Sequence, residues 1–397
     1  MHEIVILGDG LTGLTMALAL AQNGQACALV GPHVDQKITL KNNIDGRTTA
    51  IMQDGIVFLQ QLGVWKNLEK HSAPLRRMHL ISADQDIAFP SDEIGLPQFG
   101  FNIPNVLLKD VLLGALQKHG LVTLVAGTID QIVFPTEESP LHVVLLTGKP
   151  QIKLQAKLVI AADGARSKAR EAAGIIVSQH DPDQAALVGL VQADETHADT
   201  STEFYYSGGP FTLVPTIDPL QMALVYCDTP DNLDTIKSLD EDELNAHLTE
   251  MSQNRFGDLR MISPVQSWPI RPLRAESLVA PHLALIGEAA HVMPPLAAQG
   301  FNTSLRDIQA LLSVLLQTQK RGLDIAHLSH LRPYEDQRRQ DIHLRSRTVN
   351  GLNIFIRRDD QIGRRLHAAG FMALDKITPL KKLLMKFALA PRIKAVA

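Results

Sequence analysis

The stretch EIVILGDGLTGLTMALALAQNGQACALVG, residues 3–31, decides the fold class. It opens with a short apolar run, residues 3–7, which ends at Gly8. Leucines at near-helical spacing follow, and a second apolar run covers residues 26–31. A strand, a glycine-rich turn, a helix and a second strand form a βαβ unit, whose two strands are parallel. We therefore predict an α/β domain built on a parallel sheet.

The turn in this unit, GDGLTG (residues 8–13), matches the pattern G-x-G-x-x-G. The first glycine allows a tight turn, the second lets the backbone approach a pyrophosphate, and the third lets the helix pack on the strand. The free N–H groups and the positive end of the helix dipole favour phosphate at this helix start. The motif directly follows a strand and opens a helix, so it predicts a dinucleotide site.

One expected partner of this motif is missing. An acidic residue normally ends the second strand and binds the adenosine ribose. Here that position falls at Gly31, and the next acid, Asp35, would reach the ribose only if its loop curled back.

Two later apolar runs, residues 158–163 and 283–287, predict further strands of the same sheet. Alternating runs broken by Gly and Pro, at 75–100 and 183–270, predict an antiparallel sheet with one helix at 240–257. The expected fold is thus α/β with an α+β second domain. Its parts are a discontinuous Rossmann-like domain (1–74, 101–182 and 271–331), an inserted antiparallel-sheet substrate domain (75–100 and 183–270) and a C-terminal helical region (332–397).

Composition is that of a globular protein large enough for two domains, with 397 residues, 45% hydrophobic and 20% charged. The net charge of −4 argues against nucleic acid as a partner. Residues 332–397 hold 15 Lys/Arg and 6 Asp/Glu, or +9, which leaves −13 for the rest. A basic tail favours an anionic surface such as a membrane. A solvated helical face and a dimer or domain contact are the alternatives.

The cysteines and apolar runs bear on the compartment. Cys27 and Cys227 make neither a disulfide framework nor a metal site, which fits a reducing cytoplasm. No basic segment precedes the first apolar run, and no run approaches the roughly 18 residues that span a bilayer. We expect a cytoplasmic protein that is at most peripheral at the inner membrane.

Three further segments carry a family resemblance. DGRTTA (45–50), LVIAADGARSKAR (158–170) and LALIGEAAHVMPPLAAQGFNTSLRD (283–307) follow the glycine motif in order. Together they resemble the fingerprints of the class A flavoprotein aromatic hydroxylases. The segments 45–65, 99–116 and 345–390 are similar to the ubiquinone-biosynthesis hydroxylases within that group. The resemblance covers most of the chain and is weakest over 183–270, where substrate preference is set.

The resemblance implies an FAD site whose residues come from four segments. They are Gly8, Gly10, Leu11, Thr12 and Gly13 at the pyrophosphate, Arg47 beside it, Asp163 and Gly164 between FAD and the nicotinamide donor, Gly287 and Glu288 at the ribityl chain, and Pro294, Pro295, Gly300, Phe301 and Asn302 around the flavin ring. At Glu288 the family has Asp, so the carboxylate here extends one methylene further. A helix that begins near Thr303 would stabilise anionic reduced flavin with its N-terminus.

No catalytic side chain is assigned. The resemblance implies chemistry centred on the flavin, through a C4a-hydroperoxide, with Pro295, Gly300 and Asn302 as candidates at the flavin edge. Simpler interpretations stand beside the functional ones. Gly13, Gly164 and Gly300 are then turn glycines, and Asp163 caps the following helix. His291 is then a packed turn residue, and Arg306 and Asp307 are a pair on a helix surface.

The leading hypothesis is an FAD- and NAD(P)H-dependent monooxygenase that uses O₂ to hydroxylate a polyprenylated phenol in ubiquinone biosynthesis. One alternative is a flavin-poor or inactive homologue that serves as a scaffold in a quinone-biosynthesis complex. The other is a flavin oxidoreductase that acts on a different aromatic or prenyl-lipid substrate. The ring position, the choice between NADH and NADPH, and assembly into a homo-oligomer are left open by the sequence.

Overall fold

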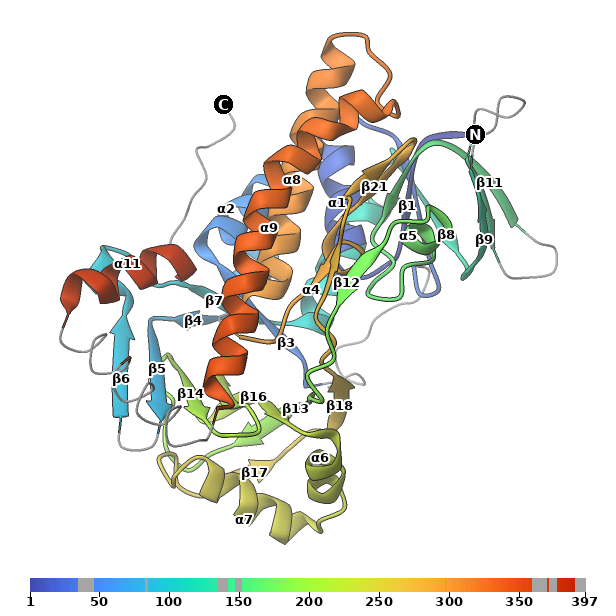
Figure 1. Ribbon diagram of the computed structural model, residues 1–397. Helices are drawn as coiled ribbons and strands as arrows, with labels where there is room; N and C mark the ends of the chain where they lie inside the picture. Colours follow the sequence, from blue (N-terminus) through green and yellow to red (C-terminus); the bar gives the residue numbers. More distant parts are fainter. Residues whose placement is uncertain are drawn as a thin grey trace.

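The computed structural model describes residues 1–34, 46–82, 85–134, 142–146, 152–296, 298–358, 370 and 377–389. Asp35 lies outside these residues. Two large sheets dominate the fold, one in the upper half of Figure 1 and one at its base, with a small sheet and two long helices between and beside them.

The first large sheet is mainly parallel and has the strand order β20-β21-β11-β1-β2-β8. Strand β20 and the hairpin β9–β10 join it in antiparallel orientation. The four strands expected from the apolar runs are confirmed, because all of them lie side by side here. The bounds are β1 (His2–Leu7), β2 (Cys27–Gly31), β8 (Val122–Ala126), β9 (Ile129–Val133), β10 (His142–Leu146), β11 (Ile152–Ala161), β20 (Val279–Ala280) and β21 (Leu283–Leu285).

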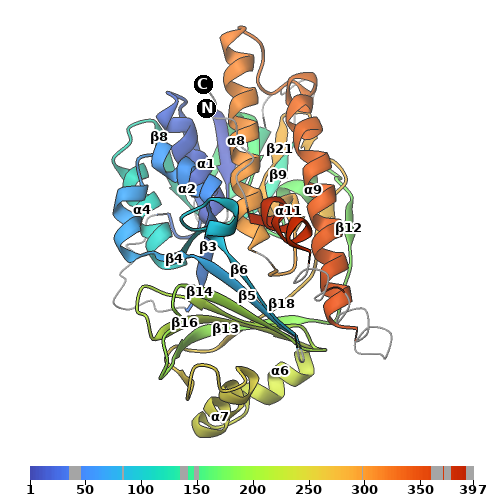
Figure 2. The same cartoon turned by 90° about the vertical axis from the view of Figure 1, so that its left-hand side faces the viewer.

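Helices cover the centre of this sheet, which explains why β2, β21 and the end of β11 are buried and apolar. The first helix packs against two others that arrive much later in the chain, and the long C-terminal helix packs on the last of these. Figure 2 shows the two long helices running side by side. The helices are α1 (Leu11–Gln22), α4 (Asn105–Gln117), α5 (Lys168–Ala172), α8 (Gln299–Lys320) and α9 (Leu328–Ile356).

The second large sheet has the order β17-β13-β16-β15-β14-β5-β6, with β18 paired to β13. It was expected to be antiparallel, and that is wrong for one pair, because β14 runs parallel to β5. Helices α6 (Pro230–Lys237) and α7 (Glu241–Met251) cover its outer face (Figures 1 and 2). The strands are β5 (Arg77–Ser82), β6 (Gln85–Pro90), β13 (Ala185–Gln192), β14 (Thr200–Tyr205), β15 (Pro210–Pro215), β16 (Gln221–Asp228), β17 (Arg260–Met261) and β18 (Gln266–Pro269).

Smaller elements connect the two halves. One three-stranded sheet, β3-β7-β4, lies between them, and another, β12-β19-β22, flanks the parallel sheet. No helix among the described residues is long and apolar enough to cross a membrane. The bounds are β3 (Thr48–Met52), β4 (Ala73–Leu75), β7 (Gly100–Pro104), β12 (Val177–Gln179), β19 (Leu273–Ala275), β22 (His291–Val292), α2 (Gln53–Gln61), α3 (Trp65–Leu68) and α11 (Thr378–Leu389).

Each large sheet has its own hydrophobic core. The core of the parallel sheet also takes in Leu331, Tyr334 and Ile342 of α9. The first half of α9 is therefore an integral part of this half of the molecule. The division of the chain into three domains, with a boundary at residue 332, stays a prediction.

Candidate active site

A cavity of about 890 Å³ lies between the two halves of the molecule. This volume is at the upper end of the range for small-molecule and cofactor sites. Its walls come from the glycine motif, the β3–β7 sheet, the segment 288–304 and the inward face of the second sheet. The sequence-predicted residues that line the cavity are Gly10, Leu11, Thr12, Arg47, Gly164, Glu288, Pro294, Pro295, Gly300 and Phe301.

The three glycines of the motif do different things. Gly8 has a φ of +108°, and a Cβ on it would overlap the carbonyl of Ala162. A Cβ on Gly13 would overlap the carbonyl of Gly8. Gly10, by contrast, faces open space within the cavity wall. Gly8 therefore lets the turn lie against the chain that leaves β11, and Gly13 lets α1 lie against the turn. Gly10 offers bare backbone beside the start of α1.

The end of β2, where the sequence lacks an acid, does have a carboxylate beside it. It belongs to Asp9, whose side chain lies so close to Gly31 that a Cβ on Gly31 would overlap it. Oδ2 of Asp9 accepts a hydrogen bond from the backbone N–H of His33 at 2.8 Å and lies 3.8 Å from Nζ of Lys109. The sequence interpretation missed this, because it looked for the acid on the strand itself.

Asp9 and Gly31 also line a second cavity of about 370 Å³, together with Gly8, Asp163 and Gly164. Oδ2 of Asp163 accepts from the backbone N–H of Ala169 at 3.2 Å, so the helix-capping interpretation is correct for this oxygen. Oδ1 is buried without a hydrogen-bond partner in the described part of the chain. Burial raises the pKa of Asp163 despite its hydrogen bonds. A buried acceptor without a donor suits a ligand that donates a hydrogen bond.

The segment 287–301 forms the opposite wall of the main cavity. Gly287 begins a short 3₁₀ turn, η4 (Gly287–Ala289), in a left-handed conformation with φ of +60°. The side chain of Glu288 is exposed to the cavity, and Pro295 and Gly300 are exposed beside it. No atom lies within 4 Å of a Cβ built on Gly300, so a flat ring has access to its backbone.

Asn302 is placed differently from the other flavin-edge candidates. Its Oδ1 accepts from the backbone N–H of Met52 at 2.8 Å. Its Nδ2 donates to the carbonyls of Ala50 at 2.8 Å and Ala298 at 2.7 Å. The side chain is 4% exposed and therefore joins the start of α8 to β3. In this arrangement Asn302 positions the cavity wall and does not form it.

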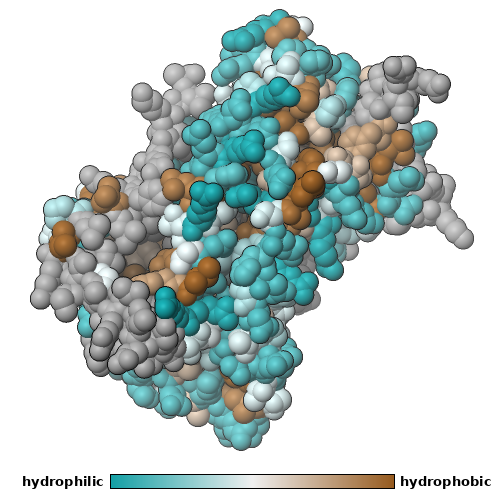
Figure 3. Space-filling view, in the orientation of Figure 1, coloured by the Kyte–Doolittle hydropathy of each residue, from teal (hydrophilic) through white to brown (hydrophobic). Residues whose placement is uncertain are grey.

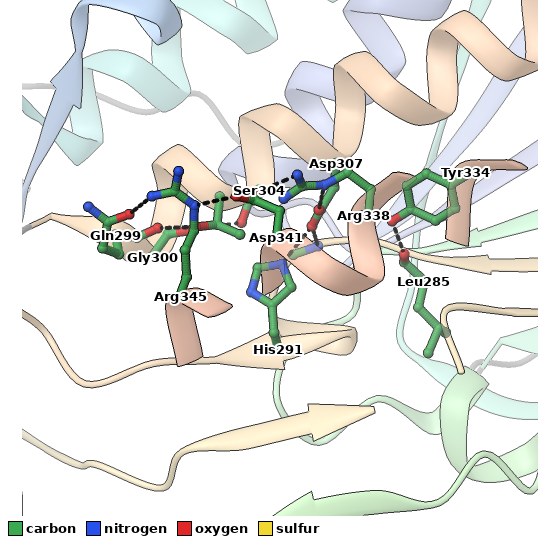
Figure 4. Close-up of polar contacts among 12 residues, drawn as sticks. Leu285, His291, Gln299, Gly300, Ser304, Asp307, Tyr334, Arg338, Asp341 and Arg345 are labelled. Atoms are coloured by element: carbon green, nitrogen blue, oxygen red, sulfur yellow. Dashed lines mark hydrogen bonds and ion pairs between the residues drawn. The ribbon is translucent and has the colours of Figure 1, made fainter. Parts of the chain in front are cut away.

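Behind the 287–301 segment lies a buried ionic network, drawn in Figure 4. Asp307, on α8, accepts from the backbone N–H of Gly287 at 3.0 Å, contacts Nε2 of His291 at 2.6 Å and accepts from Nε of Arg338 at 2.8 Å. The interpretation of Arg306 and Asp307 as a surface pair is wrong, because Asp307 is fully buried. The interpretation of His291 as a packed residue is confirmed.

The network continues along α9 to the start of α8. Arg338 and Arg345 each donate to Asp341, at 2.7 and 3.0 Å. Nη1 of Arg345 donates to the side chain of Gln299, the residue before Gly300, and Figure 4 shows these side chains in a row. The Gly287 end of the 287–300 segment is therefore held by Asp307 of α8, which Arg338 of α9 binds in turn, and the Gln299 end is held by Arg345 of α9. No local pattern indicates this network, because the arginines have the spacing of one face of a basic helix.

Burial by itself would raise the pKa of the Asp307 carboxyl. The charges of His291 and Arg338, with their hydrogen bonds, outweigh burial and hold that pKa below its ordinary value. The carboxylate therefore stays ionised and bound to its neighbours.

Arg47 lines the main cavity, as the family resemblance implies. Its guanidinium lies over the ring of Trp268, 5.7 Å from the centroid, on β18 of the second sheet. A cation–π contact of this kind ties the arginine to the far side of the cavity. Arg47 is an exposed residue of the cavity wall.

A further carboxylate in the cavity went unnoticed in the sequence. Glu203, on β14, lines the cavity but is only 6% exposed. Its Oε2 accepts a hydrogen bond from the hydroxyl of Tyr205 at 3.1 Å. Burial raises the pKa of Glu203 to about 7, although the hydrogen bond from Tyr205 opposes this. TEFYY reads as an ordinary strand, and only the folded sheet shows that Glu203 faces the cavity.

These features fit a bound FAD. Gly10 and Gly300 expose bare backbone, and α1 begins beside Gly10. Carboxylates lie where the hydroxyls of a ribose and a ribityl chain would donate hydrogen bonds. Among the described residues, no cluster of His, Cys, Asp and Glu could hold a metal ion. The fold and the cavity define the class of the protein as an FAD-dependent aromatic monooxygenase.

The chain belongs to the FAD binding domain family, which it matches over residues 1–343. It is 30% identical over 393 residues to 3-demethoxyubiquinol 3-hydroxylase of Escherichia coli K12, with 98% of each chain covered. The fold is shared with p-nitrophenol 4-monooxygenase PnpA of Pseudomonas putida DLL-E4 (17% identity, TM-score 0.79, 99% of each chain). It is also shared with Klebsiella pneumoniae HpxO complexed with FAD and uric acid (21% identity, TM-score 0.77, 98% of this chain and 96% of that one).

Proposed function

We propose that the protein hydroxylates the aromatic ring of a prenylated phenol in ubiquinone biosynthesis, with FAD as cofactor and NAD(P)H and O₂ as co-substrates. The observation that carries the proposal is the composition of the cavity of about 890 Å³. One wall holds the FAD-site motifs, and another holds apolar side chains suited to a prenyl chain, including Met52, Leu75, Met78 and Phe99. Similarity to the E. coli hydroxylase over nearly the whole chain supports the substrate class.

The proposed roles of the protein groups follow from their positions. Gly10 and the N–H groups at the start of α1 would bind the pyrophosphate, with Arg47 as a counter-charge. Glu288 accepts hydrogen bonds from the ribityl hydroxyls, and Pro295 and Gly300 pack against the ring. When bound, reduced FAD activates O₂ and supplies one oxygen atom to the substrate ring. The protein orients the phenol beside it and excludes water.

We also propose that Asp9 does the work of the missing acid at Gly31. Its carboxylate lies against the end of β2, and glycine at position 31 provides the room for it. The carboxylate has therefore moved from the strand end to the turn, and the adenosine ribose keeps an acceptor. In this arrangement FAD binding does not need Asp35.

Two experiments test the proposed function. The purified protein should be yellow, or become so with FAD, and show the visible absorbance of bound flavin. Expressed in E. coli strains that each lack one ring hydroxylase, it should restore ubiquinone in at least one, with the accumulated precursors identified by mass spectrometry. A colourless protein that stays colourless with excess FAD would favour the scaffold alternative. A flavin-bound protein that rescues no strain would favour another substrate.

A prenylated phenol resides in a bilayer, so we further propose that α11 docks on an anionic membrane. Met385 of α11 is buried in the cluster that contains Met52, Leu75 and Phe99, whereas Leu383 is 64% exposed. Figure 3 shows a hollow with hydrophobic residues at its wall between α11 and the lower part of α9. This helix therefore joins the apolar end of the cavity to the surface.

Vesicle pelleting tests this docking. Leu383→Asp in the full-length protein should reduce binding to vesicles that contain anionic lipid. The matched control is Leu323→Asp, because Leu323 is also exposed but follows α8. Equal binding of both variants and of the unchanged protein would remove α11 from the proposal.

A further inference from the structure

Among the described residues, the inward face of the second sheet presents one ionisable side chain to the cavity, that of Glu203. Glu203 is on β14, opposite Thr212 of β15 and Leu80 of β5 in the sheet register. Thr212 lines the same cavity. The rest of this wall, formed by Ser201, Val214 and Val225, carries no charge.

Tyr205 fixes the position of this carboxylate. It lies two residues along the same strand, so both side chains point to the same face of the sheet. Its hydroxyl donates to Oε2 of Glu203. Its ring packs against two apolar clusters, one with Phe89 and Phe99 and one with Met293 and Leu296. The pair thus sits where the substrate sheet meets the segment before Gly300, with the second carboxylate oxygen left for a ligand.

We infer that Glu203 is a catalytic residue that accepts the proton of the substrate's phenolic hydroxyl, and that Tyr205 positions it. The inference rests on the proposed function and deepens it. A buried carboxylate in an apolar cavity recognises a hydroxyl donor, and a phenol is the donor that the proposed substrate brings. It orients the ring toward the flavin side of the cavity at the same time.

The proton transfer makes the ring a better nucleophile. The phenolic O–H bond breaks, Glu203 binds the proton, and the electron pair left on oxygen is delocalised into the ring. A ring carbon then bonds to the electrophilic oxygen that the cofactor and O₂ supply, and the bond between this oxygen and the second oxygen atom breaks, with its electron pair going to the second atom. When that carbon loses its hydrogen to solvent, Glu203 returns its proton to the ring oxygen, and the ring becomes aromatic again. Overall, a C–H bond becomes C–OH, the second oxygen atom leaves as water, and NAD(P)H is oxidised.

The ionisation of Glu203 suits this step. Its pKa of about 7 lies far closer to neutrality than that of an exposed carboxyl, so it is a stronger base when ionised. The other ionisable groups that contact it or share its cavity come from several elements. They are Tyr205 on β14, Cys227 on β16, and His33, Arg47, Lys109 and Glu288 along the cavity wall.

The test compares Glu203→Gln, Glu203→Asp and Tyr205→Phe with the unchanged holoenzyme, using 2-geranylphenol as substrate. Glu195→Gln is the matched control, because Glu195 is exposed in the same half of the molecule. Four quantities are measured: FAD affinity by flavin fluorescence, phenol binding by the flavin absorbance change, hydroxylated product, and hydrogen peroxide. Product formation is followed from pH 5 to 9.

Glu203→Gln should lower the rate of hydroxylation by about a hundredfold or more, the usual range for a general base. It should raise the peroxide formed per NAD(P)H and leave FAD affinity within twofold. The unchanged enzyme should gain rate with pH through an inflection near 7, which Glu203→Gln should lack and Glu203→Asp should keep. Tyr205→Phe should move the inflection to higher pH, because the tyrosine hydroxyl stabilises the ionised carboxylate.

Different failures have different meanings. Hydroxylation and a pH inflection that survive Glu203→Gln would overturn the assignment and leave the proposed function intact. Loss of FAD binding together with activity would also overturn it, in favour of a structural role. An unchanged enzyme that binds FAD but neither binds nor hydroxylates the phenol would overturn both proposals.

Discussion

Asp307 and Glu203 are carboxylates that are both almost hidden from water, but their neighbours differ in charge. Asp307 meets an arginine, a histidine and a backbone N–H, and its pKa falls below the ordinary value. Glu203 meets a tyrosine hydroxyl, and its pKa rises to about 7. Full pairing makes the first carboxylate part of the scaffold. Partial pairing leaves Glu203 with a raised pKa and one carboxylate oxygen for a ligand, and a proton acceptor needs both.

The largest expected effect comes from unpairing the first carboxylate. Asp307→Asn would leave Arg338 buried without its main counter-charge, which typically costs about 3–5 kcal/mol. Urea unfolding at pH 7 measures this, with the exposed Asp336→Asn as control, for which less than about 0.5 kcal/mol is expected. Because the pKa of Asp307 is lowered in the folded state, its contribution is present above the unfolded pKa and is lost as pH falls through the folded one. An Asp307→Asn loss below about 1 kcal/mol would mean that the network does not hold the fold.

The second prediction has the opposite sign. The pKa of Glu203 is raised from 4.5 to about 7 in the folded protein. Its ionised form therefore disfavours the folded state once the pH exceeds the pKa that the group has in the unfolded state. Glu203→Gln should therefore stabilise the protein by about 3 kcal/mol at pH 9 and by almost nothing at pH 4, with the difference developing between pH 4.5 and 7. Thermal unfolding across this range, compared with Glu195→Gln, measures it. A stabilisation that does not depend on pH would show that Glu203 has an ordinary pKa.

A third carboxylate, that of Asp9, tests whether a partly paired carboxylate can also bind the cofactor. Asp9→Ala should weaken FAD binding by about ten- to a hundredfold, the value of one hydrogen bond to a charged group, about 1.5–3 kcal/mol. The double variant Asp9→Gly with Gly31→Asp should recover much of that loss by returning the acid to the strand end. Flavin fluorescence titration measures both. Unchanged affinity in Asp9→Ala would exclude a contact with the cofactor.

The smallest effect is expected at Glu288, the most exposed of these carboxylates. Glu288→Ala should loosen FAD binding by about tenfold. Glu288→Asp should keep or tighten it, because the shorter side chain matches the residue usual in the family. The same titration measures both variants. If neither changes the affinity, Glu288 does not bind the ribityl chain.

The features that could be predicted from the sequence are those that local residue patterns determine. Residues 3–31 showed strand, turn, helix and strand directly. The apolar run at 158–163 proved to neighbour β1, and the run at 283–287 pairs with β11 one strand further out. The sequence did not predict the environments of Asp307 and Glu203, because these depend on partners distant in the chain. Asp307 and Arg338 are 31 positions apart on different helices, so the motif alone read as a surface pair.

Two further structural features could not be predicted from the sequence, for physical reasons. The parallel pairing of β14 with β5 joins segments more than a hundred residues apart, and alternation of apolar residues says nothing of strand direction. The Asp9 carboxylate was overlooked because a sequence rule ties the acid to a strand end. Packing can supply the same group from a neighbouring turn, provided that residue 31 is glycine.

The ionic network also determines when, during synthesis of the chain, the cofactor site can form. Strand β1 and the glycine motif leave the ribosome long before the opposite segment, 287–300, and before the arginines at 338 and 345 that fix it. During synthesis, the whole substrate sheet is therefore made between the two walls of the cofactor site. Domains usually fold from the N-terminus as they emerge, but this site is completed only after residue 345 has emerged. We expect nascent chains that stop before residue 338 to be unable to retain flavin, however well their first βαβ unit has folded.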